Sequence, residues 1–148
     1  MVEVCRISVE IGNELSKVVG MYIIEAILQN DSGLSYICNP KSKLLKKLMA
    51  TWYQLVMCLD LEQSFSPRLL FHVLRCCFLL CNNMRGYDMI RENLPDPVSN
   101  GSFHPITDEF PVIGILLQQL ILTVDKVDSS RTASERSISD GSYTENSV

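Results

Sequence analysis

The chain has 148 residues, of which 47% are hydrophobic and 20% are charged. This length has room for one domain, and so much apolar content requires a dense core. The net charge of -4 provides no overall attraction to phosphates, so bulk electrostatics argue against nucleic-acid binding without excluding a local basic surface. The longest uncharged apolar run, 110–124, is shorter than the ~20 residues that a membrane-spanning helix needs, so we expect no membrane span.

Six cysteines could indicate a disulfide framework, but the acidic start of the chain, without a long apolar segment, predicts no signal peptide. Five of the six lie inside apolar, helix-like runs, where free cysteine behaves as a small hydrophobe. We therefore expect a reduced protein in the cytoplasm, with a nuclear location left open.

Helical periodicity dominates the first part of the chain, and no segment shows the alternation typical of strands. Asn13 is a suitable cap for a helix over 14–29. Apolar residues recur at helical spacing on one face of this helix: Leu15, Val18, Val19, Tyr22, Ile23, Ala26 and Ile27. The segment 30–33 is expected to break the helix, and 34–38 is a short apolar return.

Pro40 can start a long helix over 41–61, with lysines clustered in its first two turns. Because positive charge at a helix N-terminus opposes the macrodipole, either this cost has a functional reason or the helix begins one turn later. A loop at 62–66 then leads to Pro67, which suits the first position of a helix over 68–80.

The second half of the chain predicts two more helices. One covers 84–93 and ends at the prolines of a loop over 95–105, and the other covers 108–124 with Pro111 in its first turn. From residue 126 onward, polar residues replace almost all large apolar ones, and such a segment cannot bury enough surface to offset its ordering entropy. We predict one helical domain over 1–125 and a disordered tail over 126–148.

Helices of this length with short links favour either a bundle or a right-handed solenoid, and the pattern alone does not separate the two. Several short sequence words, however, resemble the required-for-cell-differentiation (Rcd) family, the armadillo-repeat subunit of the CCR–NOT deadenylase complex. The words include Glu14-Leu-Ser-Lys17, Gly33-Leu-Ser-Tyr-Ile-Cys38, Arg68-Leu-Leu with His72, Leu94-Pro-Asp96, Gly101-Ser-Phe103 and Leu117-Gln-Gln-Leu120. The resemblance implies an all-α, armadillo-like helical-repeat solenoid, here truncated at its N-terminus because family members are longer.

The resemblance also implies a function. It implies a non-enzymatic adaptor that binds the NOT scaffold subunit and acts in mRNA deadenylation, decay, translational repression and gene silencing. The family's scaffold contact falls on the helix that carries Val18, Val19 and Tyr22. Tryptophan-containing peptides of silencing proteins insert between helices of this part of the family, which implies a peptide pocket near Arg85, Lys41 and Lys43.

The chain departs from the family pattern near that pocket. Lys41-Ser-Lys43 stands where the family has a Tyr-x-Arg pair, and Met84 replaces a proline before Arg85. In the last predicted helix, Val112-Ile-Gly-Ile115 replaces the family's arginines and tryptophan. We therefore expect scaffold docking to be better preserved than peptide capture.

Lys41, Lys43, Lys46 and Lys47 form the one basic cluster outside the tail; such a run is usually a solvated helix face, and the alternative is binding of single-stranded nucleic acid. His72 and Cys76 share an i, i+4 spacing, but two ligands do not make a zinc site, so we expect packed residues, no metal and no cofactor. A cysteine enzyme would need a histidine that activates the thiol and a third group that orients this histidine. The chain offers only His72 and His104, so we expect no enzymatic activity.

The first segment, 1–11, is expected to start within a repeat and to leave the helix of Val19 partly uncovered. An uncovered repeat face predicts poor solubility or pairing of two copies as a homodimer.

Overall fold

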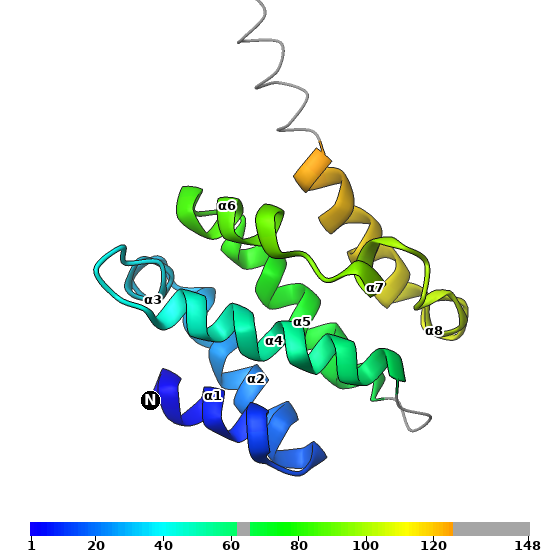
Figure 1. Ribbon diagram of the computed structural model, residues 1–148, viewed down its shortest axis with the longest axis horizontal. Helices are drawn as coiled ribbons and strands as arrows, with labels where there is room; N and C mark the ends of the chain where they lie inside the picture. Colours follow the sequence, from blue (N-terminus) through cyan, green and yellow to red (C-terminus); the bar gives the residue numbers. More distant parts are fainter. Residues whose placement is uncertain (62–65, 126–148) are drawn as a thin grey trace, which may run out of the picture.

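The computed structural model describes residues 1–61 and 66–125, which are largely helical and contain no strand (Figure 1). The helices are α1 Val2–Ile11, α2 Glu14–Leu28, α3 Asp31–Ile37, α4 Leu44–Leu61, α5 Pro67–Leu80, α6 Met84–Asn93, α7 Asp96–Ser99 and α8 His104–Glu109, followed by a helical stretch over 111–125. This confirms the all-α class. The predicted tail 126–148 and most of the predicted loop at 62–66 lie outside the described residues.

The helices stack on one another in an order that largely follows the chain. In Figure 1, α1 lies at one end and the helical stretch 111–125 at the other, with α2, α4 and α5 between them. α2 packs against α1, α3 and α5, while α4 packs against α1, α5, α6 and α7. This stacking agrees with a helical-repeat arrangement, and the armadillo-type geometry of the repeats stays a prediction.

One continuous core runs through the stack. Its largest fully buried side chains are Trp52, Phe103, Met21, Ile24, Ile37, Leu45, Leu48, Leu70, Leu74, Leu80, Ile90 and Leu120. At the far end, the Tyr87 hydroxyl donates a hydrogen bond of 2.9 Å to the backbone oxygen of Val124. Within residues 1–61 and 66–125, no helix combines the length and apolar character that crossing a membrane requires.

Helix α2 begins where the sequence predicts. The side-chain oxygen of Asn13 accepts a hydrogen bond of 2.9 Å from the backbone N–H of Ser16, which caps the helix. Its deeply buried face is different from the predicted stripe and consists of Gly20, Met21, Ile24, Glu25 and Leu28. Because α2 is apolar around much of its circumference, periodicity alone could not select which side would meet α1 and α5.

One predicted helix break is wrong, and one predicted helix start falls on the later of two alternatives, each for a local reason. Asn30 does not only end α2: its side chain accepts a hydrogen bond from the N–H of Ser32 and starts α3. α4 begins at Leu44, which agrees with the predicted alternative of a start about one turn after residue 41, and the Ser42 hydroxyl oxygen accepts a hydrogen bond from the Leu44 N–H. Lys41 therefore precedes the helix, so the unfavourable charge at its N-terminus is smaller than predicted.

The predicted loop 95–105 and last helix 108–124 also differ from the structure. The loop contains α7 and the start of α8, and the last helix is divided at Phe110 into α8 and the stretch 111–125. The φ and ψ angles of Phe110 are -122° and 84°. Pro111 disfavours a helical conformation in the residue before it and has no N–H to continue the helix.

Candidate partner-binding sites

The outward side of α2 carries three large apolar side chains, which we call the α2 outer face. Leu15 is 72% exposed, Val19 48% and Tyr22 63%. Their spacing of three and four residues places them on one side of the helix. Val18, the other residue predicted for this site, is half-buried and packs against the core. A helix that keeps such side chains in water suits a surface that a partner covers.

The α2 outer face is held in place by a polar contact beneath it. Glu25, a buried carboxylate on α2, lies with Oε2 2.5 Å from Nδ1 of His72 on α5, and its Oε1 accepts a hydrogen bond from Nε of Arg75. The ring of Tyr22 meets the ring of His72 edge to face, with 6.0 Å between the centroids. The contact therefore fixes α2 against α5 and orients Tyr22.

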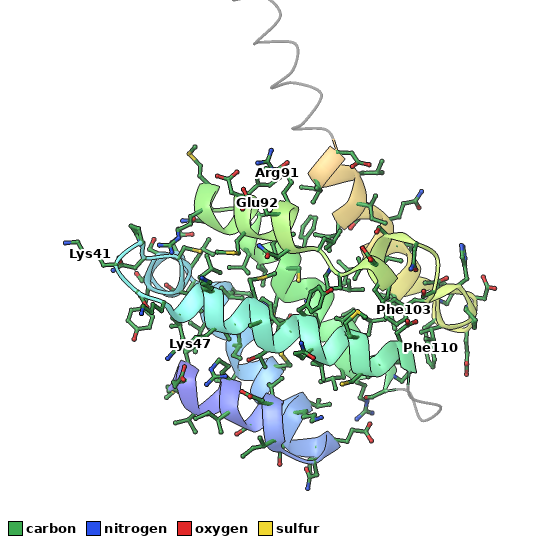
Figure 2. The ribbon with its side chains drawn as sticks, in the orientation of Figure 1. Lys41, Lys47, Arg91, Glu92, Phe103 and Phe110 are labelled. Carbon is green, nitrogen blue, oxygen red and sulfur yellow. The ribbon has the colours of Figure 1, made fainter. Side chains whose placement is uncertain are left out.

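A second site is the hollow between α4 and α6, which we call the α4–α6 groove. Its volume is about 630 Å³. It is lined by Lys46, Met49, Ala50, Tyr53, Gln54, Met89, Glu92 and Asn93. Ala50 has the smallest side chain among these residues, and Glu92 lies on the α6 side (Figure 2). An apolar cleft with a few polar groups is the usual form of a ligand site.

The cysteines of α5 have the environment of packing residues. Burial raises the pKa of the Cys76 thiol well above its usual value, raises that of Cys77 to about 12 and raises that of Cys81 to about 11. Because the thiolate is the reactive form, these thiols are poor nucleophiles. In the described part of the chain, no three His, Cys, Asp or Glu side chains gather as a group that could hold a metal ion.

Comparison with known proteins assigns the family. The model of the cell differentiation family, Rcd1-like, matches residues 1–124. The chain belongs to this Rcd1-like family. It is 32% identical to the cell differentiation protein rcd1 of Schizosaccharomyces pombe over 127 residues, which make up 86% of this chain and 44% of that protein. It is 30% identical to the protein CAF40 of Saccharomyces cerevisiae over 131 residues, 87% of this chain and 34% of that protein.

The resemblance seen in the sequence words is thus confirmed at the level of the family. This Rcd1-like chain spans less than half the length of both relatives.

The three peptide-pocket residues expected from the Rcd1-like family come from different elements of the fold. Lys41 points into solvent from the turn between α3 and α4 (Figure 2). Lys43 lines a hollow with Glu3 and Lys47 on the α1 side of α4. Arg85 stands in the first turn of α6, where its charge acts on the Cys38 thiol.

The burial of the Arg85 guanidinium could not be predicted from the sequence. Its Nη1 is buried and has no hydrogen-bond partner. Burial raises the pKa of Cys38, and the positive charge of Arg85 and the N–H of Gly86 oppose this shift. A buried guanidinium N–H without an acceptor is costly, which makes this end of α6 a place where an added acceptor would be stabilised.

The lysine cluster does not form one basic face. Lys46 lines the α4–α6 groove, whereas Lys47 lies 3.7 Å from Glu3 on α1, nitrogen to oxygen. Figure 2 shows Lys47 on the side of α4 that faces α1. The lysine cluster can be recognised from the sequence alone. Glu25 and Ala50 cannot, because their roles depend on neighbours that come from other helices.

Proposed function

We propose that this Rcd1-like chain is a non-enzymatic adaptor of the CCR–NOT deadenylase complex, acting in mRNA deadenylation, decay and translational repression through protein binding. The observation that carries the proposal is the α2 outer face, on a helix that the family uses for its scaffold contact. The α4–α6 groove supports a second binding activity on the same molecule. We place this activity in the cytoplasm.

The NOT scaffold subunit would cover the α2 outer face. Leu15, Val19 and Tyr22 are all well exposed, and fully burying one such side chain contributes about 1.5–3 kcal/mol. The ordered contact between Glu25 and His72 keeps Tyr22 in one orientation, so little freedom of this ring is lost on binding.

The α4–α6 groove would bind a tryptophan-containing peptide of the kind that the family binds. An indole ring in this groove would meet the ring of Tyr53 and the thioether of Met89, both of which make favourable contacts with aromatic groups. Lys41 and Lys43 do not line the groove, so we assign capture to the apolar residues of α4 and α6.

Co-purification with the scaffold fragment tests the first activity. We expect wild-type protein to retain the fragment and Val19→Asp to lose it, because the carboxylate would enter an apolar interface. Tyr36→Ser is the matched control, since Tyr36 is as exposed as Tyr22 but lies on α3. Retention by Val19→Asp, or equal loss by Tyr36→Ser, would contradict this assignment.

Fluorescence anisotropy of a labelled tryptophan-containing peptide tests the second activity. We expect Ala50→Trp to abolish binding because the new ring fills the α4–α6 groove. Val19→Asp should leave this binding unchanged, so the two activities can fail independently. Peptide binding that survives Ala50→Trp would place the site elsewhere.

A further inference from the structure

A third hollow, separate from both proposed sites, lies where α5 begins, and we call it the α5 groove. Its volume is about 320 Å³. One wall comes from α5 and the other from the junction of α8 with the stretch 111–125: Pro67, Arg68 and Phe71, and Glu109, Phe110, Pro111, Val112 and Ile113. Figure 2 shows Phe110 at the end of the molecule where α4 ends.

The backbone break between the last two helical segments creates this groove. The φ and ψ angles of Phe110 lie outside the helical region, and Pro111 begins a new helical stretch. Ile113 is buried and anchors the junction, while Phe110 and Val112 stay 39% and 63% exposed. Two large apolar groups are therefore presented at one rim.

The opposite wall is held in a fixed position. Phe71 is half-buried, and its ring meets the ring of His72 edge to face with 5.5 Å between centroids. The guanidinium carbon of Arg75 lies 5.7 Å from the centre of the Phe71 ring, within the range of a cation–π contact. Because both neighbours of Phe71 are tied to Glu25, this wall is formed before any ligand arrives.

Two opposite charges flank the apolar floor. Arg68 and Glu109 are both exposed and both line the α5 groove. Within the described residues, neither side chain takes part in an ion pair. An apolar cleft with one free cation and one free anion at its edge complements a ligand that carries both charges around an apolar group.

We propose that the α5 groove binds a short peptide segment of a partner protein. The segment inserts one large apolar side chain between Phe71 and Val112, sets an acidic residue beside Arg68 and sets a basic residue beside Glu109. A phosphate backbone fits less well, because Glu109 would repel it and the apolar walls offer few hydrogen bonds. This interaction is additional to the scaffold and peptide sites proposed above.

A phage-displayed library of random dodecapeptides is a direct probe of this groove. We expect the selected peptides to share a large apolar residue between an acidic and a basic one. In anisotropy measurements, Val112→Asp should weaken their binding by about tenfold or more. Leu122→Asp, an exposed apolar position on the same helical stretch outside the groove, is the matched control and should leave binding unchanged.

A charge exchange then tests the orientation of the peptide. In the double variant Arg68→Glu and Glu109→Arg, binding should be lost for the selected peptides and restored for peptides in which the acidic and basic residues are exchanged. Val19→Asp and Ala50→Trp should bind the selected peptides normally, which separates this inference from the proposed function.

Three results would overturn the proposal. One is a selection that yields no peptide with the expected pattern. Another is unchanged binding by Val112→Asp. The third is sedimentation showing that a second copy of the chain or a single-stranded oligonucleotide occupies the groove and that Val112→Asp releases it.

Discussion

Glu25 on α2 and His72 on α5 lie 2.5 Å apart, carboxylate oxygen to ring nitrogen, at the contact between two stacked helices. Arg75 takes the other oxygen of the same carboxylate, so one buried acidic group holds two basic side chains. Tyr22 of the α2 outer face and Phe71 of the α5 groove both rest on His72. This contact thus supports two of the surfaces to which we assign partners.

Replacing Glu25 should destabilise the fold. Removing one partner of a buried ion pair costs about 3–5 kcal/mol, but Arg75 is 40% exposed and can be solvated, so we expect about 2 kcal/mol for Glu25→Ala. Urea unfolding measures this loss. Glu92→Ala removes an exposed carboxylate 3.8 Å from Arg91 and should change the free energy of unfolding by less than about 0.5 kcal/mol. Equal effects of the two variants would contradict a structural role for Glu25.

Gly33 allows α3 to approach the end of α2. A Cβ at this position would lie 2.1 Å from the backbone oxygen of Ile27, which cannot move without shifting the helix. We expect Gly33→Ala to lower the free energy of unfolding by about 1–3 kcal/mol despite the higher helix propensity of alanine. At Gly114 the nearest atom would be 3.2 Å away, on the side chain of Thr107, so Gly114→Ala should be neutral or stabilising. Thermal unfolding of both variants checks the contrast.

Thiol labelling of the native protein should show one fast reaction. Cys58 is exposed, whereas Cys76 and Cys77 are buried. With a pKa of about 12, only about 10⁻⁴ of the Cys77 thiol is ionised at pH 8 even before access is considered. Mass spectrometry should therefore find Cys58 labelled first, and Cys58→Ser should remove the fast phase. Rapid labelling of Cys77 in folded protein would show that α5 is less tightly packed than described.

Because of the same buried thiols, the free energy of unfolding should decrease as the pH rises in the alkaline range. Their pKa values are raised in the folded state, so the stability they contribute is complete below the unfolded value of about 8.5 and is lost as pH rises toward the folded values. Between about pH 8.5 and 10, ionisation of Cys77 in the unfolded state alone should lower the free energy of unfolding by about 2 kcal/mol, since each pH unit contributes about 1.4 kcal/mol. Urea unfolding at several pH values measures the slope, which Cys77→Ala should reduce. A flat profile from pH 8 to 10 would contradict this.

The parts of the fold that the sequence predicted correctly depend on local chemistry. Asn13 and Pro67 mark the starts of α2 and α5 because a side-chain cap and a fixed φ act within one turn. The break at Phe110 is also local, but the sequence reading placed Pro111 inside one helix. The family words correctly identified the Rcd1-like family because several of them occur in the same order.

The candidate sites were harder to predict because they depend on contacts between distant helices. Periodicity treated Leu15 and Val19 like the core residues of α2, and only the packing of α1 and α5 shows which side stays exposed. Glu25 gave no signal in the sequence, because its role depends on His72 and Arg75 of α5. Lys41 and Lys43 were grouped with Arg85 by family analogy, and a pocket that they share stays a prediction. Arg85 on α6 acts on Cys38, which lies just before the turn that carries Lys41.

Amide hydrogen exchange with and without the scaffold fragment tests the central claim most directly. We expect the scaffold to slow exchange in α2, from Leu15 through Tyr22, and in the facing part of α5. Val19→Asp should remove this protection and leave exchange of the free protein unchanged. Protection confined to other helices, or no protection at saturating scaffold, would contradict the assignment of the α2 outer face.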